Sequence, residues 1–142
     1  MREDITMLVD YSDEILAEMK ETMLRALERC GLQAEGYAKD LAPSPGKTGN
    51  GALRTSITHK VIPDELTAYI GSILEYAAYV ELGTGIYYPG GRQEPWAYQD
   101  TDGNWYMTRG QKAKPYMKPA VENHKQTYID IINDEFDSLR NK

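Results

Sequence analysis

The sequence EYAAYVELGTG, residues 75–85, decides the fold predicted for this chain of 142 residues. Tyr76, Tyr79 and Val80 are spaced by three and four residues, so they share one face of a helix. Gly83 and Gly85 follow these residues and are predicted to end the helix, because glycine readily adopts the positive φ angles found at helix C-termini. The stretch therefore predicts a short helix of about two turns that opens into a loop. On pattern alone, a connector helix packed on a sheet explains it.

A long amphipathic helix is predicted before this stretch. Ser12 precedes two acidic residues and suits a helix start, because its hydroxyl can cap the first turn. The helix ends before Pro43, since a residue preceding proline avoids the α region. Residues 1–11 alternate weakly, which predicts a short strand or a flexible arm. The predicted apolar stripe consists of Leu16, Met19, Met23, Leu27, Cys30, Ala34, Tyr37 and Leu41.

Two β-hairpins are predicted, one on each side of the central helix. In the first, Leu53–Ile62 and Glu65–Ser72 alternate with period two and meet at Pro63-Asp64. In the second, Trp96–Gln99 and Asn104–Met107 flank an Asp-Gly turn. The tryptophans of this hairpin, Trp96 and Trp105, are either interface anchors or core residues.

A second long amphipathic helix is predicted from about Met117 onward, with Val121, Tyr128 and Leu139 on its apolar stripe. The segments 43–52 and 86–114 are rich in turn residues and are expected to be mobile loops. These elements predict a single α+β domain over residues 1–142. Its small, mostly antiparallel sheet packs with long N- and C-terminal amphipathic helices and a short central helix.

The charge of the chain is concentrated in its first helix. The net charge is −6, and residues 1–42 hold five Lys or Arg against ten Asp or Glu. Without a basic cluster, the chain is a poor candidate for gripping nucleic acid or an anionic membrane. Such acidity suits a surface past which DNA slides, and solubility explains it equally well. No run of about 18 apolar residues occurs, so we expect a soluble protein.

No convincing catalytic set is found in the sequence. His59 and His124 fall in different predicted elements, and His59 is best explained as a core or edge residue of a strand. Glu75 and Glu81 are six apart and would point about 120° from each other on a helix. Cys30 is the single cysteine, which excludes an internal disulfide. We therefore expect no enzymatic activity, no cofactor and no bound metal.

Three motifs occur in a characteristic order: PGKTGNGALRTSI at residues 45–57, YAAYVELGT at 76–84 and KPYMKPA at 114–120. In this order they resemble the minor tail proteins of phages and prophages, the tail-completion or head–tail joining family of long-tailed phages. The middle motif is the most specific of the three. The sequence departs from the family pattern in the inserted residues 50–52 and in Tyr116, which stands where phenylalanine is usual.

The resemblance implies a structural subunit of the virion without catalytic activity. It implies a homo-oligomeric ring, expected to be a hexamer, at the neck or tail terminus, assembled in the host bacterial cytoplasm. Its partners would be a head–tail adaptor and a tail-tube or tail-terminator protein. DNA would be at most a passing, non-specific neighbour, and no membrane would be involved. The alternative from a different class is a stand-alone module that binds a peptide or small ligand with its Tyr/Trp-rich loop.

The family's pattern also suggests roles for particular residues. Tyr76, Tyr79 and Val80 would anchor the central helix on the sheet, and Glu81 would be held by local hydrogen bonds. Gly83 and its neighbours would release the chain into a partner-facing loop. The full set expected to matter for structure or interaction is Leu53, Arg54, Tyr76, Tyr79, Val80, Glu81, Gly83, Thr84, Trp96, Trp105, Pro115 and Tyr116.

Overall fold

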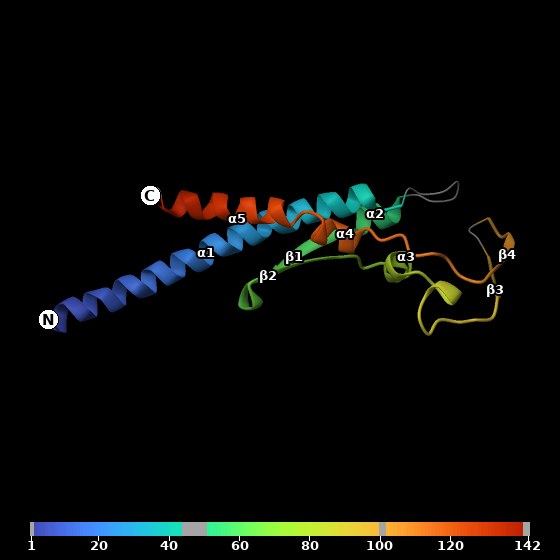
Figure 1. Cartoon of the computed structure of the whole chain (residues 1–142), viewed down its shortest axis with the longest axis horizontal. Coiled ribbons are helices and arrows are strands. Elements are labelled where there is room, and N and C mark those ends of the chain that lie inside the picture. The colour runs from blue at the N-terminus through green and yellow to red at the C-terminus, as the bar shows by residue number, and fades with distance from the viewer. Residues whose placement is uncertain (1, 44–50, 100–101, 141–142) are drawn as a thin grey trace.

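A computed structural model describes residues 2–43, 51–99 and 102–140 of the chain. The fold is α+β and elongated, as predicted in class, with long helices near both ends of the chain (Figure 1). Helix α1 (Arg2–Leu41) and helix α5 (Lys125–Arg140) lie side by side and run in opposite directions. The strands form two separate two-stranded antiparallel sheets, so the expected single sheet is divided in two.

Helix α1 begins ten residues earlier than Ser12, and the prediction of a strand or flexible arm over residues 1–11 is wrong for residues 2–11. No glycine or proline, the residues that most disfavour a helix interior, occurs before Gly31. The helix continues through its two glycines and ends at Leu41, before Pro43 as predicted. Its 40 residues span about 60 Å.

The buried face of α1 is a row of small residues, and the predicted stripe of large ones is only partly correct. Leu16 and Leu41, both assigned to the apolar stripe, are 62% and 46% exposed. Apart from Gly31, the buried positions of α1, together with Ala42 directly after it, recur every four residues, which is one row along the helix surface. They are Thr22, Ala26, Cys30, Ala34, Ala38 and Ala42. Small side chains here let the hairpin and the C-terminal helices approach the α1 backbone closely.

The first hairpin is shorter than predicted. Strands β1 (Thr58–Ile62) and β2 (Thr67–Gly71) pair in antiparallel register and are joined by a 3-10 turn, Pro63–Glu65, as predicted for the connection. The preceding residues form a short helix, α2 (Ala52–Ser56), so the strand expected from Leu53 is wrong over this stretch. A reason is local hydrogen bonding, since the Ser56 hydroxyl donates to the Leu53 carbonyl at 2.6 Å.

The central helix and the second hairpin are confirmed. Helix α3 (Ala77–Leu82) ends at Gly83, whose φ is 83°. A 3-10 turn (Gly85–Tyr87) leads to strands β3 (Trp96–Gln99) and β4 (Trp105–Thr108), which pair with each other. Segment 86–114 therefore contains regular structure, and Ala52 of segment 43–52 lies in α2. Residues 44–50, which include the GKT sequence, and residues 100–101 of the Asp-Gly turn lie outside the described residues.

The predicted last helix is two helices. Helix α4 (Met117–Glu122) is separated from α5 by Asn123 and His124. At this junction the His124 ring stacks on Tyr37 of α1, with ring centroids 3.5 Å apart. The break lets α4 and α5 follow different paths along α1 (Figure 1). The core lies where α1, α2, α3 and α4 meet and contains Ala38, Ala42, Leu53, Ile57, Ala77, Tyr116 and Ala120.

Candidate functional site

Glu81 joins the central helix to the start of α4. Its Oε2 atom accepts hydrogen bonds from the backbone N–H groups of Tyr116 at 2.7 Å and Met117 at 2.9 Å. Its Oε1 atom accepts one from the N–H of Lys118 at 2.9 Å. These first amide groups of a helix have no carbonyl partner within it, and a carboxylate is favoured there by the helix dipole. The expectation of local hydrogen bonds is wrong, because the partners lie 35 to 37 residues further along the chain.

Tyr116 fills the centre of the core. Its side chain is fully buried, and its hydroxyl donates a hydrogen bond to the carbonyl of Ala77 in α3 at 3.0 Å. Burial, followed by the nearby negative charge of Glu81, raises the pKa of the phenol above its usual range. The hydroxyl of this buried residue therefore has a defined hydrogen-bond partner.

The Gly-Thr-Gly stretch is bound along its length to residues 109–114. The N–H of Thr84 donates to the carbonyl of Gln111 at 2.9 Å, and the N–H of Gln111 donates to the Thr84 hydroxyl at 2.9 Å. A Cβ atom on Gly83 would lie 3.0 Å from the backbone nitrogen of Ala113. The glycines are required by close backbone approach as well as by positive φ. Gly83 thus ends α3 as predicted, and the residues that follow are held against residues 109–111 by backbone hydrogen bonds; that the loop beyond them faces a partner stays a prediction.

The two tyrosines of the central motif face outward. Tyr76 is 44% exposed and Tyr79 is 61% exposed, so the prediction that they anchor α3 on the sheet is wrong. The anchoring side chains are Ala77, which is buried, and Val80, which packs against the core as predicted. A small residue is preferred at the contact because the backbone of α3 approaches the Tyr116 hydroxyl.

The remaining predicted site residues divide between core and surface. Leu53 is a core residue. Arg54 is exposed, and its guanidinium donates to the carbonyl of Ala42 at 3.4 Å. Pro115 is exposed immediately before the Glu81 cap. The structure thus brings Leu53, Glu81 and Tyr116 into one unit.

The two tryptophans lie on the β3–β4 hairpin. Trp105 is 68% exposed, so the core alternative is wrong for it, while Trp96 is half-buried with the Arg92 guanidinium 5.6 Å from its ring centroid. Tyr98 and Tyr106 are cross-strand partners whose rings stack at 5.6 Å. The hairpin therefore displays aromatic side chains to the surroundings, and their use as interface anchors stays a prediction.

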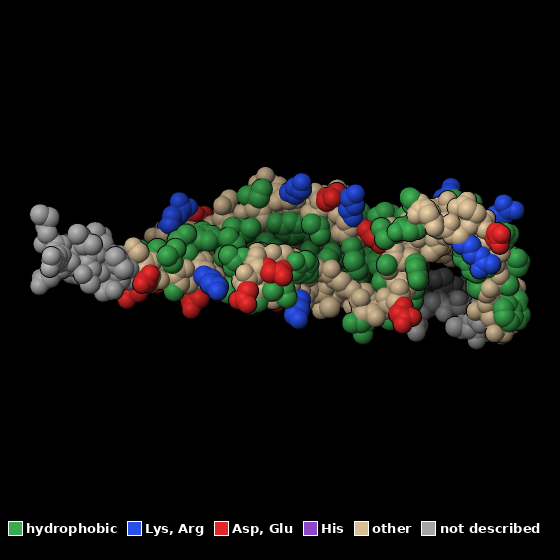
Figure 2. Space-filling view, turned by 90° about the horizontal axis from the view of Figure 1, so that it is seen from below, with side chains coloured by type: hydrophobic (Ala, Val, Ile, Leu, Met, Phe, Trp, Pro, Cys, Tyr) green, Lys and Arg blue, Asp and Glu red, His purple; other side chains and the backbone are tan. Residues whose placement is uncertain are grey.

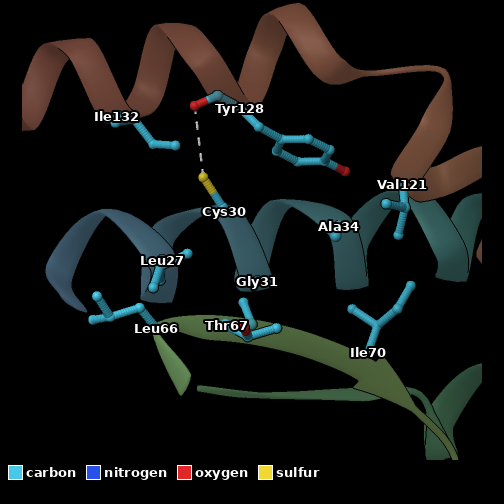
Figure 3. Close-up of a pocket in the computed structure, with 11 residues that line it drawn as sticks. Leu27, Cys30, Gly31, Ala34, Leu66, Thr67, Ile70, Val121, Tyr128 and Ile132 are labelled. Atoms are coloured by element: carbon cyan, nitrogen blue, oxygen red, sulfur yellow. Dashed lines mark hydrogen bonds between the residues drawn. The ribbon is translucent and has the colours of Figure 1, made fainter. Parts of the chain in front are cut away.

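An apolar groove lies between α1, strand β2 and the C-terminal helices (Figure 3). Its volume is about 300 Å³, and it is bordered by Leu27, Ala34, Ile70, Val121 and Ile132. Figure 2 shows hydrophobic side chains gathered along the hollow in the middle of this face.

Cys30 belongs to the floor of this groove, and its thiol points to the carbonyl of Tyr128, with the sulfur 3.7 Å from that oxygen. Burial raises the pKa of this thiol, which disfavours the reactive thiolate. Periodicity alone gave no signal for the groove, because its walls come from elements about 40 to 100 residues apart in the chain.

His59 fastens β1 to α1. Its Nε2 lies 2.6 Å from Glu28 Oε1 and its Nδ1 lies 3.4 Å from Glu35 Oε1. The ring passes over Gly31, where an added Cβ would lie 2.8 Å from the ring's Cδ2 atom. Sequence reasoning placed His59 in a strand without finding these partners. A signal was present, since Glu28, Gly31 and Glu35 are spaced by three and four on one face of α1.

Stability is expected to fall as pH rises through the titration of His59. Its hydrogen bond to Glu28, with a smaller contribution from Glu35, raises the pKa of the imidazole above its ordinary value of 6.5. The stabilisation is fully present below pH 6.5 and is lost as pH rises through the raised folded-state value. We expect the free energy of unfolding of the wild type, relative to His59→Asn, to decline over this window in denaturation experiments. A constant difference would contradict the ion pair.

Glu81→Ala is expected to lower the free energy of unfolding by about 2 kcal/mol, because three amide groups lose their charged acceptor. Urea denaturation followed by circular dichroism measures the loss. Glu81→Gln keeps the shape and one acceptor oxygen and should lose about half as much. Glu75→Ala, an exposed acidic residue outside α3, is the control and should change stability by less than about 0.5 kcal/mol.

Comparisons with known proteins found no matching family model, no matching curated protein and no matching solved structure. Within residues 2–43, 51–99 and 102–140, no group of three or more His, Cys, Asp or Glu side chains is placed to hold a metal ion. In the same part of the chain, no helix has both the length and the apolar character needed to cross a bilayer.

Proposed function

We propose that this chain is a non-enzymatic structural subunit of a long-tailed phage or prophage virion, acting in tail completion or head–tail joining. The ordered motifs at residues 45–57, 76–84 and 114–120 support this through their resemblance to that family. The geometry adds that the described parts of all three motifs contact one core, through Leu53, Ala77 and Tyr116. Residues that are far apart in the sequence but recur together in a family are expected to share such a unit.

The observation that carries an assembly role is the exposure of neighbouring large apolar side chains on two separate elements. Ile15, Leu16 and Met19 of α1 are 55%, 62% and 42% exposed. Trp105 and Met107 are each 68% exposed on β4, which lies at the end of the molecule away from the N-terminus (Figure 1). Single exposed apolar residues are ordinary, whereas groups of them typically mark contact surfaces. Two separate groups on one chain suit a subunit that contacts neighbours on two sides.

In this proposal identical subunits close into a ring, expected to be hexameric, at the neck or tail terminus. One face of the ring would contact a head–tail adaptor and the other a tail-tube or tail-terminator protein. DNA would pass without specific binding, helped by the acidity of α1, of which Glu28 is also engaged by His59.

Gene deletion in a phage or lysogen that encodes the chain tests the proposal. Electron microscopy of the lysate should show heads separated from tails, or tails whose ends are abnormal. The infectious titre should fall by orders of magnitude. Supplying the wild-type chain from a plasmid should restore joined virions. Virions of normal number and form without the chain would refute the proposed role.

The alternative function, a stand-alone binding module, is favoured by the exposed aromatic hairpin. Tyr98, Trp105 and Tyr106 are 44%, 68% and 46% exposed and are of the type that anchors peptides. This alternative would be supported over the structural role by a peptide or small ligand that binds the monomer and protects Trp105 fluorescence from quenching. The protein should then remain a monomer when the ligand is bound.

A further inference from the structure

Residues 12–21, in the first half of α1, present an uncovered apolar stripe. Every residue from Ser12 to Lys20 is exposed, and Ile15, Leu16 and Met19 lie on one side of the helix at 55%, 62% and 42% exposure. A helix without tertiary contacts is marginal in water at this length. This part of the helix is therefore expected to be more stable when another surface covers its apolar stripe.

The same segment, residues 12–21, is also acidic. Residues 12–21 contain four acidic residues, Asp13, Glu14, Glu18 and Glu21, against Lys20. In the part of the chain that the structure describes, none of these side chains forms an ion pair. A surface that covers the stripe should therefore be apolar and carry positive charge.

The β3–β4 end of the molecule presents exposed apolar and basic side chains. The segment 103–121 contains Arg109, Lys112, Lys114 and Lys118 and no acidic residue, and Arg109 and Lys112 are exposed and follow β4 directly, whereas Glu94 and Asp102 are exposed acidic residues of the same hairpin region. Trp105 and Met107, each 68% exposed, lie on the same face of β4 because side chains alternate along a strand. A hollow of about 300 Å³ beside them is bordered by Pro95, Met107, Thr108 and Arg109.

These two surfaces cannot meet within one copy. The first half of α1 and the β3–β4 hairpin lie at opposite ends of the long axis (Figure 1), and α1 alone spans about 60 Å.

We propose that the acidic first half of α1 in one copy of this chain binds the Trp105–Met107 face and the adjacent basic segment of the next copy. This inference rests on the proposed function and deepens it, because it names the two surfaces that would close the ring. Ile15, Leu16 and Met19 cover Trp105 and Met107, while Glu14 and Glu18 approach Arg109 and Lys112. Such a contact joins different patches on the two copies, so it repeats from copy to copy and closes at a fixed number.

Charge favours this occupant over a symmetric pairing of two α1 helices. Two copies of residues 12–21 would bring together stretches in which acidic residues outnumber basic ones by four to one. Like charges placed opposite each other across an interface are strongly disfavoured. Contact with the segment 103–121 instead opposes charges of different sign and covers apolar groups on both sides.

Two double charge reversals test the contact. One variant carries Glu14→Lys with Glu18→Lys, and the other carries Arg109→Glu with Lys112→Glu. Sedimentation velocity at low salt measures self-association over a concentration series, since salt screens such contacts. Each variant alone should associate at least about tenfold more weakly than the wild type. Glu122→Lys and Lys60→Glu, exposed charges on α4 and β1, are the matched controls and should associate normally.

Mixing the two variants gives the decisive readout. The reversed helix of the first variant fits the reversed end of the second, and the unaltered helix of the second fits the unaltered end of the first. An equimolar mixture should therefore regain wild-type association, whereas neither variant alone does. Circular dichroism must show that both variants keep wild-type helix content, and Leu16→Ser with Met19→Ser should weaken association without altering charge.

Several results would overturn the contact. They are a wild-type chain that stays monomeric at low salt up to the highest concentration, association unaffected by the Arg109 and Lys112 reversals, or a mixture that does not recover. Binding of the first half of α1 to an unrelated basic protein but not to this chain would also overturn it. A ring that persists in both variants refutes this contact and leaves the proposed function standing. Normal virions without the chain refute the function alone.

Discussion

Tyr116→Ala is expected to lower the free energy of unfolding by about 4 kcal/mol, the largest single-residue loss in this chain. The side chain is fully buried among Leu53, Ala77 and Ala120, so its removal leaves a cavity in the only core cluster described. Because a stability of about 5 to 15 kcal/mol is usual for a domain, this loss should also lower the yield of folded protein. Urea denaturation followed by far-ultraviolet circular dichroism measures it.

Tyr116→Phe is the matched control for this prediction. It keeps the packing and removes only the hydroxyl that donates to the Ala77 carbonyl, so about 1 kcal/mol should be lost. The difference between the two variants separates packing from hydrogen bonding. Equal losses in both variants, or a loss below about 1 kcal/mol for Tyr116→Ala, would contradict the placement of this residue in the core.

Gly85→Ala should destabilise the chain by about 3 kcal/mol, the second largest effect. The residue has a φ of 60°, and an added Cβ would overlap the carbonyl oxygen of Arg109. The overlap is with backbone, so relief requires the two paired segments to separate and breaks the hydrogen bond from Ile86 N–H to Arg109 O at 3.0 Å. Thermal unfolding and hydrogen exchange of the Thr84 and Ile86 amides would report both consequences.

Gly36→Ala provides the contrasting substitution. Gly36 lies inside α1, and an added Cβ would meet no atom within 4 Å. Alanine favours the helix over glycine by about 1 kcal/mol, so this variant should be as stable as the wild type or more stable. A destabilised Gly36→Ala with an unaffected Gly85→Ala would refute the close approach of residues 84–86 to residue 109.

The periodicity of apolar residues in the sequence predicted which helices and strands occur more accurately than it predicted the residues at which they begin and end. The long α1 helix, both hairpins and the central helix follow from spacings that persist over many residues. The strand expected from Leu53 failed because Ala52–Ser56 satisfies its hydrogen bonds locally as a helical turn. The break at Asn123 was missed because the stripe of apolar residues continues across it, and the stacking of His124 on Tyr37 depends on tertiary structure.

The residues of the candidate site were found by motif, while their roles required the structure. Glu81 was singled out in the sequence, but its partners in α4 are more than 30 residues away and leave no local signal. On α3 the sequence offers tyrosines on one face and alanines on another. Large aromatic residues were expected to face inward, yet close approach of the α3 backbone to Tyr116 selects Ala77 instead. Of the small row on α1, the predicted stripe contained only Cys30 and Ala34, because its other positions were assigned to large residues.

The cap of α4 by Glu81 has a consequence for biosynthesis. Helix α1 (Arg2–Leu41) is synthesised before Tyr116 and before the amide groups whose hydrogen bonds Glu81 accepts. Until they leave the ribosome, the buried row of α1 has neither the core aromatic residue nor α5 to cover it. The nascent chain therefore carries α1 with part of its buried row uncovered, although the β1–β2 hairpin can already pack on it, until residues 116–140 emerge. Truncated products that stop before residue 116 should depend on chaperones or be degraded, whereas a chain that includes α4 and α5 should fold.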